Sequence, residues 1–152
     1  MGTYALFIDL EREMQMRVGA LGPCMFPRGV HVYAGSAMRG LRTRLARHVR
    51  REKIIQWHVD WLTTVNGCQV LGAVVFTSTV LPECNIVGYL MDFEGAEVRP
   101  PRFGASDHAC RGHLVWIGEE VSSYQVAIDL LTNRTTGGRW LSREEIRRPG
   151  DK

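Results

Sequence analysis

The stretch VLGAVVFT, residues 70–77, decides the class of fold that this sequence can adopt. It is a nearly continuous apolar and β-branched run, which is typical of a strand buried on both faces. We therefore expect a central strand here. Two earlier strands are expected over residues 3–9 and 30–34, with a hairpin-like pairing between them, and a last strand over 113–117.

Helical signals lie between these expected strands. The clearest spans residues 37–53, because bulky positions recur on one side at helical spacing, with Ser36 as the N-cap candidate. A second helix is expected from Pro82 to about Phe93 and a third over 124–131. Residues 57–64 are compatible with either a helix or a strand. Residues 11–17 indicate a short connecting turn or helix.

The order β-β-α-(α)-β-α-β predicts an α/β (α+β) protein with a small mixed, mainly antiparallel central sheet flanked by helices. A length of 152 residues suits one compact domain. We expect that domain over residues 1–132. Residues 133–152 are polar, contain glycine and are rich in arginine, so they are expected to form a loosely ordered C-terminal tail.

Composition excludes few classes of function. The net charge of +3 is only mildly basic. The sequence lacks the roughly 18 consecutive apolar residues that cross a bilayer, and its N-terminal residues lack the positive start of a secretory signal. We therefore expect a cytoplasmic protein with no membrane partner and with reduced cysteines. The oligomeric state is left open.

Positive charge is concentrated in the expected helix over residues 37–53. Arg44 and His48 are four residues apart and therefore share a face. The other cations are Arg39, Arg42, Arg47, Arg50, Arg51 and Lys53, against the single acid Glu52. Such a segment attracts nucleic-acid phosphates without regard to base sequence. A solvated helix face is the alternative explanation.

Two short motifs and three later residues resemble the GIY-YIG nuclease superfamily. The triplets GTY, residues 2–4, and YAG, residues 33–35, are similar to its GIY and YIG elements. Arg44, His48 and Glu83 then stand at the positions of the arginine, histidine and glutamate of that superfamily. Isolated triplets are weak signals, whereas this ordered series is a specific one. The resemblance implies a β-β-α-β-α core.

The resemblance is closer to one branch, the small stand-alone domains of poorly defined function that are also found fused to archaeal endonuclease III. It covers roughly residues 2–117. The segments that carry it are FPRG (26–29), YAGSA (33–37), RLARH (44–48), WHVDWL (57–62), EC (83–84), FGASD (103–107) and HL (113–114).

The resemblance implies a metal-dependent endonuclease that hydrolyses phosphodiester bonds in DNA, with branched, damaged or recombining DNA as candidate substrates. Tyr33 is then the general base, and Tyr4 shares or exchanges this role. Arg44 holds the scissile phosphate, and His48 contacts the phosphate or the tyrosines. Glu83 is the ligand of one Mg²⁺ or Mn²⁺ ion. Core packing of the tyrosines, and a helix-dipole role for Glu83, are the alternatives.

The substrate is expected to lie against Gly35, Ser36, Arg47, Arg51 and His58. Many repair-type members carry a lysine where this chain has Ser36, and that lysine helps to lower a tyrosine pKa. Another cation, with Arg47 as the candidate, would have to replace it.

Several roles stay open at this stage. Trp57, His58 and Asp60 suit either a structural or a functional role, and so do Ser106 and Asp107. The spacing Cys110-x-x-His113, with Cys84 or His108, supplies too few ligands to indicate zinc.

Two other functions remain as alternatives to the enzyme. One is a non-catalytic nucleic-acid-binding module that retains the nuclease fold. The other is a protein-interaction domain that uses Trp57, Trp61 and Trp116. The choice between DNA and RNA also stays open.

Overall fold

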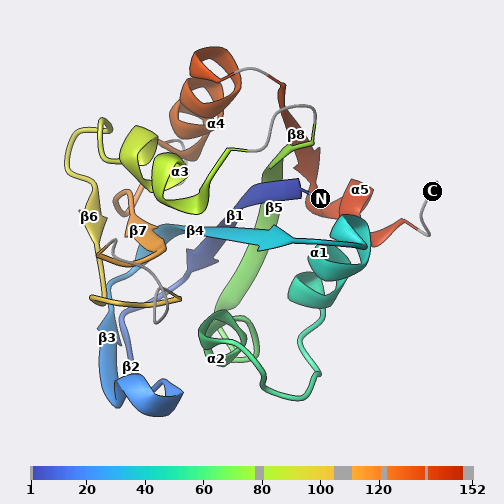
Figure 1. The fold of residues 1–152 in the computed structure, drawn as a ribbon. Coiled ribbons are helices and arrows are strands. Elements are labelled where there is room, and N and C mark those ends of the chain that lie inside the picture. The colour runs from blue at the N-terminus through green and yellow to red at the C-terminus, as the bar shows by residue number, and fades with distance from the viewer. Residues whose placement is uncertain (1, 78–80, 105–110, 121–122, 136, 149–152) are drawn as a thin grey trace.

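A computed structural model describes the chain except for residues 1, 78–80, 105–110, 121–122, 136 and 149–152 (Figure 1). Its centre is a six-stranded sheet with the order β6-β7-β4-β1-β5-β8 and antiparallel pairing between all neighbours. The expected α+β class with a helix-flanked, antiparallel central sheet is confirmed. The strands are β1 (Gly2–Leu10), β4 (Gly29–Ala37), β5 (Cys68–Phe76), β6 (Glu97–Val98), β7 (Leu114–Trp116) and β8 (Gly138–Ser142).

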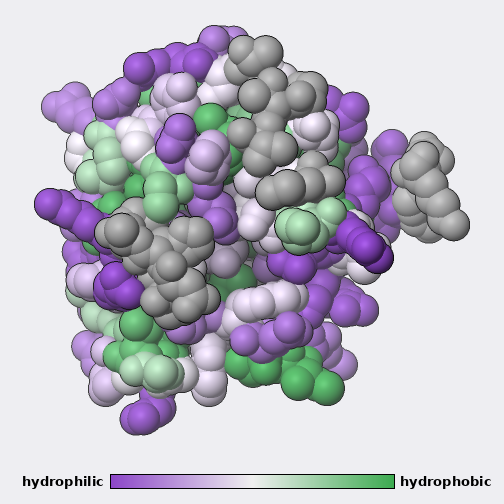
Figure 2. All heavy atoms as spheres, viewed as in Figure 1, coloured by the Kyte–Doolittle hydropathy of each residue, from purple (hydrophilic) through white to green (hydrophobic). Residues whose placement is uncertain are grey.

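Helices cover both faces of this sheet (Figure 1). One face carries α1 (Leu41–Val49), α2 (His58–Thr63) and α5 (Arg143–Arg147), and the other carries α3 (Glu83–Leu90) and α4 (Ser123–Arg134). Because side chains alternate along a strand, Tyr4, Leu6 and Ile8 of β1 enter the first core, whereas Ala5 and Phe7 enter the second. Hydrophilic side chains cover much of the outer surface in Figure 2, with smaller hydrophobic areas between them.

A separate two-stranded sheet lies outside the central one. It pairs β2 (Met14–Arg17) with β3 (Pro23–Phe26), and the short 3-10 helix η1 (Gly19–Leu21) connects them. The expected turn or helix over residues 11–17 is therefore wrong. Met14 is buried and Gln15 is exposed, and Met16 packs against the core. This alternation has the period of a strand.

The helix expected over residues 37–53 is shorter than predicted. Ser36 continues β4 opposite Thr3 and does not cap the helix, which follows Gly40 in a left-handed conformation with φ of 62°. The ambiguous segment 57–64 contains helix α2. Among the described residues, no helix has the length and apolar character needed to cross a membrane.

The segment expected as a loosely ordered tail, 133–152, instead contains the end of α4, β8 and α5. β8 pairs with β5 from Gly72–Ser142 to Phe76–Gly138. Leu141 and Ile146 are each only 3% exposed. These two apolar residues stand among arginines and glutamates, so a prediction from composition alone misses the ordered structure of this segment.

The pairing of β1 with β4 places Tyr4 directly opposite Gly35. A Cβ atom added at Gly35 would lie 2.5 Å from both Cζ and Oη of Tyr4. The Tyr4 ring therefore lies against the backbone of β4, and glycine at position 35 is the residue that permits this approach.

Replacing Gly35 by alanine is expected to destabilise the fold by about 1–3 kcal/mol, because Tyr4 must move out of a packed core. Gly88→Ala is the matched control. Gly88 is an exposed helical residue of α3 with open space at its Cβ position, so alanine there should stabilise by about 0.5–1 kcal/mol. Urea unfolding measures both changes. Equal, small effects at the two positions would contradict the close Tyr4–Gly35 packing.

Candidate active site

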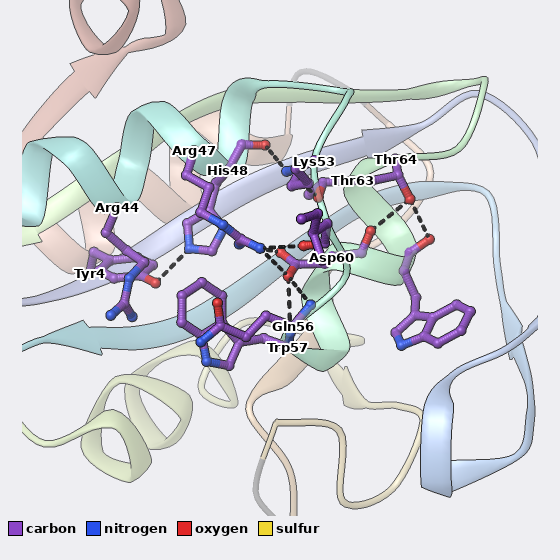
Figure 3. Close-up of polar contacts among 12 residues, drawn as sticks. Tyr4, Arg44, Arg47, His48, Lys53, Gln56, Trp57, Asp60, Thr63 and Thr64 are labelled. Atoms are coloured by element: carbon purple, nitrogen blue, oxygen red, sulfur yellow. Dashed lines mark hydrogen bonds and ion pairs between the residues drawn. The ribbon is translucent and has the colours of Figure 1, made fainter.

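A hydrogen bond joins Tyr4 of β1 to His48 of α1. The Tyr4 Oη and His48 Nε2 atoms are 2.7 Å apart (Figure 3), and both residues are 1% exposed. Burial lowers the pKa of His48 to about 3, with the charge of Lys53 acting in the same direction. The imidazole is therefore neutral at pH 7. In the tautomer protonated at Nδ1, its Nε2 atom accepts the Tyr4 hydroxyl proton.

Tyr33 completes a cluster of three rings. Its ring centre lies 6.4 Å from that of Tyr4 and 6.2 Å from that of His48. Burial raises the pKa of both tyrosines above the usual value. The positive charge of Arg44 partly opposes this rise, and the negative charge of Glu83 adds to it. Both phenols are thus protonated at neutral pH. Either can act as a base only if additional positive charge close to it lowers its pKa.

Arg44 is positioned by the strand end and by an aromatic ring. Its Nη1 atom donates to the Ser36 carbonyl oxygen at 2.9 Å, and its guanidinium carbon lies 4.2 Å from the centre of the Trp57 ring. A guanidinium over an indole face is a favourable cation–π arrangement. Figure 3 shows Arg44 beside Tyr4, on the same side of α1 as His48.

Glu83 reaches the same strand end from the helix on the other face of the sheet. It is the first residue of α3, and its Oε2 atom accepts a hydrogen bond from Ser36 Oγ at 3.3 Å. Ser36 therefore contacts both the guanidinium of Arg44 and the carboxylate of Glu83. The short strand β7 pairs with β4 only over residues 31–33 of β4. Ser36, which makes both contacts, lies three residues beyond the end of that pairing.

The structure thus places the five expected catalytic residues around one end of β4. They are Tyr4, Tyr33, Arg44, His48 and Glu83, and the expected substrate contacts Gly35 and Ser36 lie among them. We call these seven residues the tyrosine cluster. They come from β1, β4, α1 and α3, and the antiparallel pairing of β1 with β4 places the tyrosines of the two strands in one cluster.

Arg47 forms a partly buried ion pair with Asp60 beside this cluster. Its two terminal nitrogens each lie 2.8 Å from an oxygen of Asp60, and Nη2 also donates to the Ile54 carbonyl. The backbone N–H groups of Gln56 and Trp57 donate to the same carboxylate. Burial tends to raise the pKa of Asp60, but these hydrogen bonds outweigh it and leave the pKa below its usual value.

Asp60 therefore has a structural role that sequence reasoning left open. It occupies the third position of α2 and caps the start of that helix. Arg47 was the candidate to replace the missing lysine, but Asp60 and Ile54 hold its guanidinium. The cation that partly opposes the burial-driven rise in the pKa of both tyrosines is Arg44. In the sequence, the signal for this capping role was the acid three residues after Trp57, at the third position of the helix.

Two residues that sequence reasoning did not single out as site residues support Tyr33. Gly104 has a positive φ of 70°, and a Cβ there would lie 2.9 Å from Tyr33 Cε1. The Phe103 ring lies 6.2 Å from Tyr33 and 5.6 Å from His58. His58 Nδ1 accepts a hydrogen bond from the Gly104 backbone at 2.8 Å. The open roles of Ser106 and Asp107 lie outside the described residues.

Arg51, an expected substrate contact, lies away from the tyrosine cluster. It donates to Asn66 Oδ1 and to the Cys68 carbonyl, and it lines a cavity together with residues of α5. The structure therefore does not bring Arg51 together with Tyr4 and Tyr33.

The possible metal ligands near the cluster are oxygen atoms. The Glu83 carboxylate and the Ser36 hydroxyl are suited to Mg²⁺ or Mn²⁺, which accept waters and phosphate oxygens as further ligands. Within the described part of the chain, no three His, Cys, Asp or Glu residues form a group that could hold a metal ion. Cys84 Sγ and His113 Nε2 are 3.8 Å apart. Cys110 and His108, the other zinc candidates, lie outside the described residues.

The fold and the tyrosine cluster define a mixed α+β domain with buried phenols, a guanidinium and one carboxylate at a strand end. Residues 3–135 match the family model described as "Domain of unknown function DUF123". The chain therefore belongs to this family. The match contains the tyrosine cluster and ends before β8. Searches among curated proteins and among solved structures found no match.

The buried, neutral state of His48 predicts how stability depends on pH. The folded pKa of about 3 lies below the unfolded value of about 6.5, so the unfolded chain binds more protons between these values. The free energy of unfolding should therefore fall as pH drops from about 6.5 toward 3. His48 contributes a slope of up to about 1.4 kcal/mol per pH unit.

Urea unfolding at several pH values measures this slope. His48→Gln should show a shallower slope than the parent protein, because glutamine does not titrate. His31 is also buried, and burial lowers its pKa to about 4, so it should preserve part of the slope in this variant. An unchanged slope in His48→Gln would contradict the buried, neutral state of this ring.

Proposed function

We propose that this chain is a GIY-YIG-type, metal-dependent endonuclease that hydrolyses phosphodiester bonds in DNA. The observation that supports this proposal is the convergence of Tyr4, Tyr33, Arg44 and Glu83 around Ser36. These residues come from distant parts of the chain, and each occupies a position that the motif series predicts. Core packing of the tyrosines alone does not require a guanidinium and a carboxylate beside them.

Arg44 has the geometry to hold the scissile phosphate. The Ser36 carbonyl uses one of its five N–H donors, and the planar fork of a guanidinium matches two phosphate oxygens. Its positive charge also stabilises the negative charge that develops on the phosphoryl oxygens during attack. Trp57 restricts the guanidinium to this orientation by stacking.

The pair of Tyr4 and His48 has the geometry of a proton relay. Hydrolysis requires that the attacking water lose one proton, which the relay accepts, and that the leaving oxygen gain one, which solvent water supplies. The Tyr4 oxygen accepts the water proton while its own proton passes to His48 Nε2, which is 2.7 Å away. A bound phosphodiester brings negative charge that raises the pKa of His48 and favours this transfer.

Tyr33 is the second candidate for the base, since it shares the cluster with Tyr4. A divalent cation held by Glu83 would supply positive charge that lowers the pKa of the phenols and polarises the phosphoryl group. Ser36 orients the Glu83 carboxylate through its hydroxyl group. The proposed partner is DNA, with branched or damaged DNA as candidate substrates, and the proposed location is the cytoplasm.

Two observations favour a second candidate function, a nucleic-acid-binding module without catalysis. Burial raises the pKa of both tyrosines, and Ser36 stands where many repair-type nucleases have a lysine that would counteract this. Such a module would bind nucleic acid with a steep dependence on salt concentration. Its binding would not depend on Glu83.

Purified protein, incubated with Mg²⁺ or Mn²⁺ and a panel of flaps, junctions and single strands, tests the proposed activity. Tyr4→Phe should reduce cleavage by about 100-fold or more, the usual scale for loss of a catalytic proton-transfer group, and Tyr33→Phe should do so instead if Tyr33 is the base. Glu83→Gln should also abolish most of the cleavage, because it removes the ligand of the divalent cation. Glu94→Gln and Tyr124→Phe are matched controls, because Glu94 follows α3 and Tyr124 packs against the second core, on the other face of the sheet. RNA versions of the same substrates identify the nucleic acid.

Cleavage that survives in Glu83→Gln at the parental rate would refute the proposed enzyme. Salt-dependent binding without cleavage, equal in the parent protein and Glu83→Gln, would support the binding module instead.

A further inference from the structure

A cavity of about 430 Å³ lies between the end of α1, strand β5 and helix α5. The basic residues that line it are Arg50, Arg51, Arg143 and Arg147. Among the described lining residues there is no carboxylate. This cavity, which we call the arginine pocket, is distinct from the tyrosine cluster, because its lining shares no residue with that cluster.

Four positive charges around one cavity repel each other, and this repulsion must be offset by water or by an anion. An adjacent hollow, which shares Arg51 and Arg143 with the pocket, is lined by two acids, Asp9 and Glu11. Burial raises the pKa of Asp9, which makes its charged form less favourable. The two carboxylates of the hollow are fewer than the four guanidinium groups of the pocket, so they compensate its charge only in part.

Arg143 provides the second observation. Its Nε–H group is buried and has no hydrogen-bond partner within the described structure. A buried donor without an acceptor is costly. Arg143 also lines the arginine pocket, so a rotation of its guanidinium toward the cavity would allow a ligand oxygen to accept this hydrogen bond. Arg51, by contrast, is held by the Asn66 side chain and the Cys68 carbonyl, which fixes its guanidinium at the cavity wall.

We propose that the arginine pocket is a phosphate-binding site. Guanidinium groups bind phosphate oxygens through paired N–H donors, and several converging arginines match a group that carries more than one negative charge. The polar donors in the wall are less suited to an apolar ligand. The phosphate belongs either to a nucleic-acid backbone or to a small phosphate compound, and binding does not depend on the proposed nuclease activity.

Helix α1 connects this pocket to the tyrosine cluster. Arg44 and His48 lie on the side of α1 that contacts Tyr4, whereas Ala46, Val49 and Arg50 line the pocket. A nucleic-acid strand bound at the pocket would therefore contact helix α1, which also carries Arg44, the residue proposed to hold the scissile phosphate.

Titration with inorganic phosphate, followed by calorimetry or ³¹P NMR, tests the pocket. Arg147→Gln and Arg143→Gln should each raise the dissociation constant of phosphate about tenfold. Arg148→Gln removes the same charge from the adjacent residue, which does not line the pocket, and should change it less than twofold. Arg147 is exposed, so its substitution should not disturb folding, and a thermal unfolding curve checks this.

Equal effects of Arg147→Gln and Arg148→Gln, or no phosphate binding by the parent protein, would overturn the proposal. A single-stranded oligonucleotide then separates the two sources of phosphate. If the source is nucleic acid, the oligonucleotide should displace phosphate, and Arg147→Gln should weaken its binding while Glu83→Gln should not. Phosphate binding that the oligonucleotide leaves unchanged supports the pocket with a small phosphate compound as its ligand, whatever the outcome of the nuclease assay.

Discussion

The close approach of the Tyr4 ring to the backbone at Gly35 is the constraint on which the rest of the site depends. It follows from the β1–β4 register, which places the two residues opposite each other. With the ring held there, its hydroxyl group reaches His48 on α1 at 2.7 Å. Arg44, one helical turn before His48, is then directed to the Ser36 carbonyl at the same strand end. A single strand pairing thus fixes the positions of three groups with different chemistry.

Burial gives these groups their electrostatic character. It raises the pKa of both phenols and lowers that of His48, so the ring cluster is neutral in the folded protein. The fixed charges beside it are the guanidinium of Arg44 and the carboxylate of Glu83, which Ser36 connects. Such a site responds strongly to added charge, because buried groups are poorly screened by water. A cation and a phosphodiester would therefore change the protonation of the rings in opposite directions.

The sequence predicted the features that depend on local pattern and motif order. The apolar run at 70–77 gave the buried strand, and the spacing of Arg44 and His48 gave their shared helix face. Other features depend on partners that are distant in the chain. Asp60 could be assigned a capping and ion-pairing role only once Arg47 was placed beside it, and Gly104 acquires its role from the Tyr33 ring. Strand β8 and helix α5 were missed because their buried apolar residues, Leu141 and Ile146, are few and stand among charged ones.

Binding of Mn²⁺, followed by NMR of protein labelled at its four tyrosine rings, tests the central claim most directly. Paramagnetic broadening is steeply distance-dependent, and Tyr89 and Tyr124 provide internal controls in the same molecule. If Glu83 holds the cation beside the buried phenols, the Tyr4 and Tyr33 signals should broaden first, and Glu83→Gln should abolish this selectivity. Uniform broadening of all four rings, or selective broadening that persists in Glu83→Gln, would contradict the account.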